Sequence, residues 1–255
     1  LLSDRLAQAI EGARQNPTDQ FSLLHLRFER FRQLSDSLGR GVGDRFLIAI
    51  AQRIQALMRP SDLLARLEGD DFGILVLHPG GGTQHARALA GRLQQAFAAP
   101  VLIDDTEVQT GAGIGITCSD IGYAVAEDAL RDAQLALGMS ARSGQGRCAV
   151  FDPSLHDRAG ELLLLETDLR RALEAEQLSL AFQPVFGIEP QRLIGFEALA
   201  RWPHVTRGMV SPGEFIPVAE ASGLIVPLTR WALWAACAQL SQWRARHADL
   251  EALFV

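Results

Sequence analysis

The chain has 255 residues, of which 48% are hydrophobic and 21% are charged, so its composition indicates one large or two medium folded domains rather than a disordered protein. A formal net charge of -6 and a pI near 5.5 argue against a nucleic-acid-binding protein, because such proteins usually present clustered cations to phosphates. All 24 basic residues are Arg, which excludes lysine Schiff-base chemistry and the P-loop lysine, and leaves Arg or backbone N–H groups to hold any phosphate.

The cysteines and the apolar stretches indicate a cytoplasmic location. Cys118, Cys148 and Cys237 lack the close spacing of a zinc site or a disulfide framework, which fits a reducing compartment. The longest apolar stretch, at 224–240, is interrupted by polar residues and by proline, and it predicts a buried helix rather than a membrane span. The chain could still form the cytoplasmic part of a larger sensor protein.

The first third of the sequence predicts a strand, a helix and a hairpin. Residues 21–28, FSLLHLRF, form an apolar run typical of a strand. A turn is expected in the glycine-rich segment 39–43, and apolar residues at helical spacing predict a helix over 44–58. The runs at 63–67 and 72–77 have period-two apolar positions and flank the letters EGDD. They predict a β-hairpin with EGDD at its tip.

The next elements complete an α/β domain. Apolar residues at helical spacing predict a helix over 86–97, and a second helix is expected at 126–142 before a strand at 148–151. Residues 108–116 predict a strand in which glycines at 111, 113 and 115 leave one face bare, so we expect a helix backbone to pack closely there. These glycines do not match the G-x-G-x-x-G pattern of a dinucleotide site.

A second domain is expected after a linker. Leucines that recur at three, four or seven residues predict a helix over 155–175. Strands follow at 178–186 and 193–202, helices at 212–221 and 227–246, and a third strand begins at 253–255. We therefore predict a first domain at 1–152, a linker helix at 153–176 and a second domain at 177–255.

The two adjacent carboxylates at the hairpin tip, Asp70 and Asp71, allow three interpretations. They could bind a hard cation, act as an acid/base pair, or be solvated turn residues, since Asp and Gly favour turns for backbone reasons alone. A magnesium site would need further oxygen ligands from a neighbouring strand end. The candidate neighbour is the strand that ends LHLRFER.

Longer segments resemble known signalling domains. LLHLRFERFRQLSDSLGRGVGDRFL, RPSDLLARLEGDDFGIL and VQTGAGIGIT resemble the GGDEF domain of diguanylate cyclases. FQPVFGIEPQRLIGFEALARW and SPGEFIPVAEASGLIVPLTRWAL resemble the start of the EAL domain of cyclic di-GMP phosphodiesterases. The resemblance implies a nucleotide-cyclase-like sheet with flanking helices, a linker helix and the N-terminal part of a (β/α)8 barrel.

The GGDEF resemblance implies a degenerate cyclase site. Active cyclases carry an Asp where this chain has Arg27, and that Asp binds magnesium together with the third signature letter. A guanidinium about 5 Å from a divalent ion repels it by about 6 kcal/mol at an effective dielectric near 20, so we expect no metal at this site. The side chain of Glu68, at a position where the family has glycine, also obstructs the nucleotide. The signature itself reads Glu68, Gly69, Asp70, Asp71 and Phe72 instead of Gly-Gly-Asp-Glu-Phe.

Other family positions are partly kept. The Asn that reads guanine aligns with Ser35, whereas its companion is retained as Asp44; the phosphate-holding Lys and Arg align with Ala141 and Gln145. We therefore expect a catalytically inactive domain, in which Arg27 pairs with Asp70 or Asp71 in place of a cation.

The four residues RPSD at 59–62 are a candidate for a separate inhibitory site. RPSD precedes the signature by five residues, where the family's RxxD motif binds cyclic di-GMP through its Arg and Asp, here Arg59 and Asp62. The same four residues also suit a helix stop and a turn.

The EAL resemblance implies that Glu197 is a ligand of catalytic Mg or Mn, which activate water for phosphodiester hydrolysis. Gln183, Leu199 and Arg201 match positions that line the cyclic di-GMP pocket. The family's metal-binding Asn falls where the sequence reaches Val255, and further ligands would follow, so hydrolysis is expected only with a complete barrel.

Three functional readings remain open. The first is a regulatory protein of cyclic di-GMP signalling with an inactive GGDEF domain and an EAL domain that binds cyclic di-GMP. The second is an active phosphodiesterase in the complete protein, with GTP as a further candidate ligand through Asp44. The third is an interaction scaffold that binds no nucleotide. A homodimer or a protein partner is compatible with each.

Overall fold

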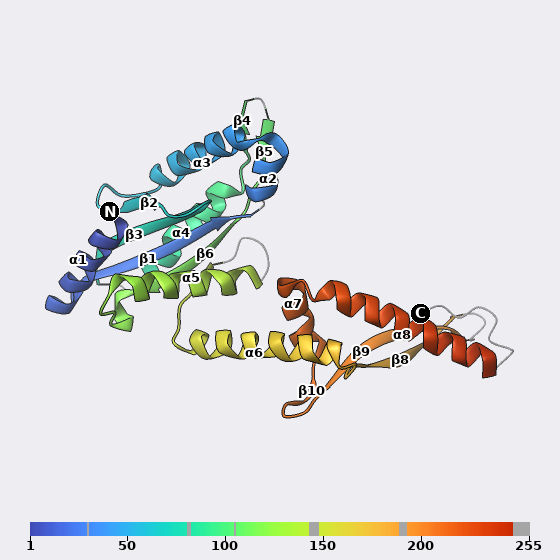
Figure 1. Ribbon diagram of the computed structural model, residues 1–255. Helices are drawn as coiled ribbons and strands as arrows, with labels where there is room; N and C mark the ends of the chain where they lie inside the picture. The colour runs from blue at the N-terminus through green and yellow to red at the C-terminus, as the bar shows by residue number, and fades with distance from the viewer. Residues whose placement is uncertain (30, 81–82, 105, 143–147, 189–192, 247–255) are drawn as a thin grey trace. The chain divides into compact units, whose positions relative to one another are not determined.

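The computed structural model of the chain describes residues 1–29, 31–80, 83–104, 106–142, 148–188 and 193–246. These residues belong to two compact units, Leu1–His156 and Asp157–Val255 (Figure 1). Within these ranges, no helix has both the length and the apolar character needed to cross a membrane.

The first unit is a five-stranded sheet with helices on both faces. The strand order is β2-β3-β1-β6-β7; β1 runs antiparallel to β3 and β6, and β6 runs parallel to β7. A separate two-stranded pair, β4 with β5, lies outside this sheet. In chain order the elements are α1 (Leu2–Gln15), β1 (Asp19–Phe28), α2 (Phe31–Leu38), α3 (Arg40–Gln55), β2 (Leu63–Arg66), β3 (Asp71–Pro79), α4 (Thr83–Phe97), β4 (Val101–Ile103), β5 (Thr106–Val108), β6 (Ala112–Cys118), α5 (Ala126–Arg142) and β7 (Cys148–Val150).

The central strand β1 is buried on both faces, which explains its continuous apolar sequence. Leu24 and Leu26 belong to a core that also contains buried residues of α3 and α4. Phe21 and Leu23 belong to a second core formed with α1 and α5. Because successive strand residues point to opposite faces, residues 25 and 27 share the face of α1 and α5.

The glycines of β6 allow α5 to approach the sheet closely, as the sequence predicted. A Cβ atom on Gly115 would lie 2.0 Å from the carbonyl oxygen of Ala133 and 2.3 Å from the backbone nitrogen of Leu137. Both atoms belong to the backbone of α5, so the prediction of a helix backbone against the bare face is confirmed.

The sequence misplaced one turn of the first unit and did not predict some of its elements. The turn expected at 39–43 is confined to Gly39, whose φ of 88° is left-handed, and α3 already begins at Arg40. Gly43 is helical and faces Ser35 of α2, a helix that was not predicted, as α1 and β4 were not.

The strand expected at 108–116 is two strands. Between β5 and β6, the hydroxyl of Thr110 donates to the carbonyl of Glu29, and the N–H of Glu29 donates to the carbonyl of Gly111. These bonds tie the segment to the end of β1, so β6 begins only at Ala112.

The second unit contains most of a long helix and a three-stranded antiparallel sheet of order β10-β9-β8. Trp202 and Phe215 are fully buried in its core together with Leu165 and Leu169 of α6. The helix predicted at 155–175 is confirmed as α6. The elements are α6 (Ser154–Glu174), β8 (Ser179–Phe186), β9 (Leu193–His204), β10 (Gly208–Val210), α7 (Pro212–Ser222) and α8 (Ile225–Arg246).

The described residues of this unit do not form a closed barrel. Strand β9 pairs with β8 from Leu193 to Arg201, and it pairs with β10 only from Trp202 to His204. Along Leu193–Arg201, the second edge of β9 therefore has no partner strand in the part of the chain that the structure describes. The strand predicted at 253–255 lies outside the described residues.

Candidate functional site

The EGDD hairpin, formed by β2, the turn at 67–70 and β3, lies against the end of β1. Arg27 of β1 is the direct neighbour of Asp71 in the β1–β3 register. The turn is closed by its own backbone: the N–H of Asp71 donates to the carbonyl of Glu68 at 3.0 Å, and the N–H of Leu67 donates to the carbonyl of Asp71 at 2.9 Å. Gly69 has a φ of 62°, a left-handed conformation that favours glycine, so this signature glycine has a backbone role.

Asp71 is the acceptor at the centre of the site. Its side chain accepts two hydrogen bonds from the guanidinium of Arg27, from Nε to Oδ1 and from Nη2 to Oδ2, both 2.7 Å long. The imidazole Nε2 of His25 lies 2.9 Å from the same Oδ2. Asp71 is 7% exposed. The predicted pairing of Arg27 with Asp70 or Asp71 is thus confirmed for Asp71.

Burial and these contacts shift the pKa values of Asp71, His25 and Asp70. Burial alone would raise the pKa of Asp71, but the hydrogen bonds from Arg27 and His25 outweigh it and hold that pKa below its ordinary value. Burial lowers the pKa of His25, and the contact with Asp71 only partly opposes this. Burial raises the pKa of Asp70, which is only partly exposed.

His25 was not identified from the sequence. The signal was present, because residues 25 and 27 lie on the same face of a strand and both face the hairpin. A polar residue in an otherwise apolar run needs a buried partner, and Asp71 supplies it.

The remaining signature residues take structural positions. Glu68 is exposed at the turn. Phe72 is buried at 2% exposure and packs edge-on against Phe28, with ring centroids 5.9 Å apart.

The candidate guanine positions lie close to one another. Ser35 of α2 faces Gly43 of α3, and Asp44 follows on the exposed side of α3. Position 141 belongs to the last turn of α5, whereas Gln145 lies outside the described residues.

Arg59 and Asp62 form a compact turn between α3 and β2. The Oδ2 atom of Asp62 accepts the backbone N–H of Arg59 at 2.8 Å, and the N–H of Asp62 donates to the carbonyl of Arg59 at 3.0 Å. The Oδ1 atom of Asp62 is buried and has no hydrogen-bond partner among the described residues, and the Arg59 side chain is exposed. The turn role is thus observed, and a ligand role stays a prediction.

In the second unit, the four predicted residues lie on the β8–β9 pair. Gln183 is directly opposite Glu197 in the register, and both are exposed. Glu197, Leu199 and Arg201 alternate along β9 and therefore share one face. These three also line a pocket of about 670 Å³ that is bounded by α7 and α8, while Gln183 does not.

The chemistry of this pocket is mainly apolar. Its helical walls include Ile216, Ile225 and Leu228, so charged groups enter only from β9. No cluster of three or more His, Cys, Asp or Glu residues suited to a metal ion occurs within the described ranges of either unit. Trp202 is buried, and His204 contacts Asp168 and accepts a backbone N–H of the following turn, so both have packing and loop roles.

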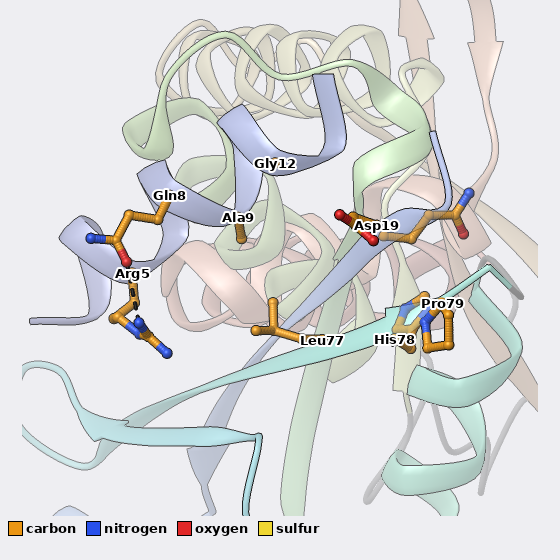
Figure 2. Close-up of a pocket in the computed structure, with 9 residues that line it drawn as sticks. Arg5, Gln8, Ala9, Gly12, Asp19, Leu77, His78 and Pro79 are labelled. Carbon is orange, nitrogen blue, oxygen red and sulfur yellow. Dashed lines mark hydrogen bonds between the residues drawn. The ribbon is translucent and has the colours of Figure 1, made fainter. Parts of the chain in front are cut away.

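A different pocket, of about 400 Å³, lies at the opposite end of β1 and β3 from the hairpin turn (Figure 2). It is bounded by α1, where Arg5 donates to Gln8 at 3.2 Å. None of the residues predicted from the sequence to bind a ligand lines it.

The sequence of the chain matches two known protein families. Residues 1–147, more than half of the chain, match the family described as "Diguanylate cyclase, GGDEF domain". The chain belongs to the GGDEF family. Residues 166–255 match the EAL domain, so the GGDEF domain is followed by a partial EAL domain.

Relatives and solved structures agree with this assignment. The chain is 36% identical over 250 residues to the bifunctional diguanylate cyclase/cyclic di-GMP phosphodiesterase MucR of Pseudomonas aeruginosa, covering 98% of the chain and 36% of MucR. It is 34% identical over 221 residues to the cyclic di-GMP phosphodiesterase NbdA of the same organism, covering 86% of the chain and 28% of NbdA. The chain thus spans about a third of these relatives.

The GGDEF unit also matches a solved structure. The crystal structure of the GGDEF domain of YfiN from Pseudomonas aeruginosa superposes with a TM-score of 0.56 at 31% identity, covering 59% of this chain and 93% of that one. The predicted GGDEF-like sheet with flanking helices is confirmed.

Proposed function

We propose that the chain is part of a bacterial cyclic di-GMP signalling protein whose GGDEF domain regulates or senses and does not synthesise the dinucleotide. The observation that carries this proposal is the two-pronged ion pair between Arg27 and Asp71. It occupies the corner at which active members of the family are expected to hold magnesium.

The residues at this corner do not fit a divalent cation. Asp71 already accepts three hydrogen bonds, and two of them reach Oδ2. A magnesium ion needs near-octahedral oxygen ligands, whereas Arg27 offers only donors and a positive charge. Because phosphoryl transfer depends mainly on metal-assisted charge stabilisation, a domain without the cation loses most of its catalysis.

The proposed regulatory role uses residues that remain available. Asp44 is exposed on α3 beside the α2 contact and is a candidate contact for GTP. Arg59 and Asp62 are candidate contacts for cyclic di-GMP, since the exposed guanidinium of Arg59 suits phosphate and Asp62 lies in the same turn. We place the GGDEF domain at 1–152, the linker helix at 153–176 and the EAL portion at 177–255, in the cytoplasm.

The proposed EAL role is to bind cyclic di-GMP. Glu197 would be one ligand of Mg or Mn in the complete protein, where such ions activate water. Gln183, Leu199 and Arg201 would contact the dinucleotide from the same strand pair. The open edge of β9 supports further strands and a barrel in the complete protein.

A second candidate function is phosphodiesterase activity of the complete protein. The exposed position of Glu197, opposite Gln183, favours it, since a metal ligand must be accessible. A scaffold that binds no nucleotide is the third candidate.

Two measurements on the complete protein test these proposals. With GTP and Mg²⁺ or Mn²⁺, we expect no cyclic di-GMP above background by liquid chromatography; synthesis would refute the proposed inactivity. Calorimetry should detect binding of cyclic di-GMP, and Arg201→Ala should weaken that binding. The matched control is Arg230→Ala, because Arg230 lies on α8 and does not line the pocket. Equal binding of cyclic di-GMP by both variants would contradict the assigned EAL site. If neither cyclic di-GMP nor GTP gave heat on titration, the scaffold would be supported.

A further inference from the structure

The pocket of about 400 Å³ at the far end of β1 and β3 is a groove between α1 and the sheet (Figure 2). Its helical wall is one stripe of α1 at three- and four-residue spacing, formed by Arg5, Gln8, Ala9 and Gly12. No atom lies within 4 Å of a Cβ added to Gly12, so this wall is open. Leu77 of β3 lines the opposite side and is 37% exposed. The groove therefore has space for an apolar side chain beside Leu77.

Strand β3 continues past the end of its neighbour β2. Leu63, the first residue of β2, pairs with Leu75, so no described strand pairs with Val76–Pro79 on that side. On the other side, the same four residues pair with β1. This end of β3 is therefore an open sheet edge in the part of the chain that the structure describes.

The backbone hydrogen-bonding groups of Leu77 point toward this open edge. In an antiparallel sheet, the backbone groups of successive residues point alternately to the two neighbouring strands. The N–H of Gly80, just after β3, donates to Thr18 on the β1 side. The carbonyl of Asp71 accepts a hydrogen bond from Leu67 on the β2 side. Because the β1–β3 register is continuous, odd-numbered residues of β3 are directed away from β1, and Leu77 is one of them.

The two ends of the groove carry opposite charges. Arg5 and Asp19 line it at opposite ends, and both are exposed (Figure 2). Within the described residues neither side chain forms an ion pair, and the guanidinium of Arg5 donates to the neutral carboxamide of Gln8. Asp19 alternates with Phe21, a residue of the core formed with α1, so it shares the α1 face of the sheet. A bound segment with opposite charges at its two ends would match both residues.

We propose that this groove binds an extended peptide segment of a partner protein, in which a basic, an apolar and an acidic residue alternate with two others. The segment would add a strand to the open edge of β3 and exchange both backbone hydrogen bonds with Leu77. Its apolar residue, opposite Leu77, and its basic residue, two positions earlier, would both face α1.

The orientation of the segment follows from the sheet. A strand antiparallel to β3, as β2 is, would run from the Asp19 end toward the Arg5 end, so the basic residue comes first. The acidic residue would leave the edge where β2 begins. The N-terminal half of α1, which carries Arg5, lies close there, since a Cβ added to Gly73 would meet Leu2 at 2.6 Å. This proposal does not depend on the proposed function of the EGDD hairpin.

The test measures binding of the peptide Lys-Val-Leu-Val-Glu to the complete protein by fluorescence anisotropy. The peptide is acetylated at its N-terminus and carries fluorescein on a Gly-Ser spacer at its C-terminus. The comparison peptide, Glu-Val-Leu-Val-Lys, has the same composition and label. We expect it to bind about tenfold more weakly, because each of its ends meets a like charge in the groove.

Reversing the charges of the protein should invert this preference. The double variant Arg5→Glu with Asp19→Lys should bind Glu-Val-Leu-Val-Lys more tightly, and both positions are exposed, so the fold should be kept. The matched control is Arg14→Glu, because Arg14 is also exposed on α1 and does not line the groove. The control should keep the preference of the unchanged protein.

Backbone amide exchange locates the bound peptide. With Lys-Val-Leu-Val-Glu bound, the amide of Leu77 should exchange more slowly, measured by mass spectrometry with fragmentation. The amide of Leu24, in the buried centre of β1, should not change.

The outcomes are decisive in both directions. Inversion of the preference together with protection of Leu77 would support the proposal. It would be refuted by failure of both peptides to bind the unchanged protein, by equal affinities, by a preference that the double variant keeps, or by binding without protection of Leu77. Sedimentation velocity tests another occupant: a dimer of the unchanged protein that the double variant dissociates would assign the groove to a second copy of the chain and overturn the proposal.

Discussion

Replacing Gly115 by Ala should destabilise the first unit strongly. The added Cβ would lie 2.0 Å from the carbonyl oxygen of Ala133 and 2.3 Å from the nitrogen of Leu137, and both are backbone atoms that cannot change rotamer. To restore an ordinary contact, α5 would have to move away from β6 by more than about one ångström. Insertion of one carbon into a packed core costs about 1–3 kcal/mol, and a clash with backbone atoms belongs at the upper end, near 3 kcal/mol.

The assay is urea denaturation with two probes. All four tryptophans, at 202, 231, 234 and 243, lie in the second unit, so their fluorescence reports on that unit alone, while far-UV circular dichroism reports on both. With an m-value near 2 kcal/mol/M, the first-unit transition of Gly115→Ala should fall by about 1.5 M urea.

Gly91→Ala is the matched control. Gly91 lies within α4, no atom lies within 4 Å of its added Cβ, and Ala is the better helix former by about 1 kcal/mol. This variant should be as stable as the unchanged chain or more so. If Gly115→Ala were no less stable than Gly91→Ala, the close approach of α5 to β6 would be refuted.

Three further predictions concern titration and the second unit. Burial raises the pKa of Cys118 to about 11, which leaves about one thiolate in a thousand at pH 8, so iodoacetamide should label exposed Cys237 and spare Cys118 in a peptide map. Burial raises the pKa of Asp70, so the fold disfavours its charged form; Asp70→Asn should raise the free energy of unfolding at pH 7 by a small amount, since solvent screens this partly exposed group, and the gain should be lost as the pH falls below about 4, measured by urea midpoints. His204 accepts two backbone N–H groups of the following turn and contacts Asp168 at 3.2 Å; His204→Ala should cost about 2 kcal/mol and His204→Asn, which keeps a turn acceptor, about 1 kcal/mol by tryptophan fluorescence.

Periodicity predicted the elements that bury apolar faces. The apolar run at 21–28 forms the buried strand β1, and the glycines of β6 face the backbone of α5, both as predicted. The break between β5 and β6 could not be predicted, because it depends on hydrogen bonds between Thr110 and the distant Glu29. The start of α3 was predicted too late because Gly41 and Gly43 are typical turn residues. In the structure both are helical, and Gly43 gives room for Ser35 of α2.

At the candidate site, the sequence predicted only that opposite charges would pair. Opposite charges at a strand end and a hairpin tip were expected to pair, and Arg27 and Asp71 do. The choice of Asp71 over Asp70 depends on strand register, which places Asp71 directly beside Arg27. Strand alternation places His25 on the same face as Arg27, but its pairing with Asp71 also depends on the β1–β3 register, which the sequence does not give.

The closed turn of the EGDD hairpin has a consequence for how the domain responds to its surroundings. Its backbone bonds and the ion pair beneath it all come from within the chain. The hairpin should therefore keep the same shape at any magnesium concentration. Such constancy suits a surface that other proteins recognise, and amide exchange in the hairpin should be unchanged by a metal chelator.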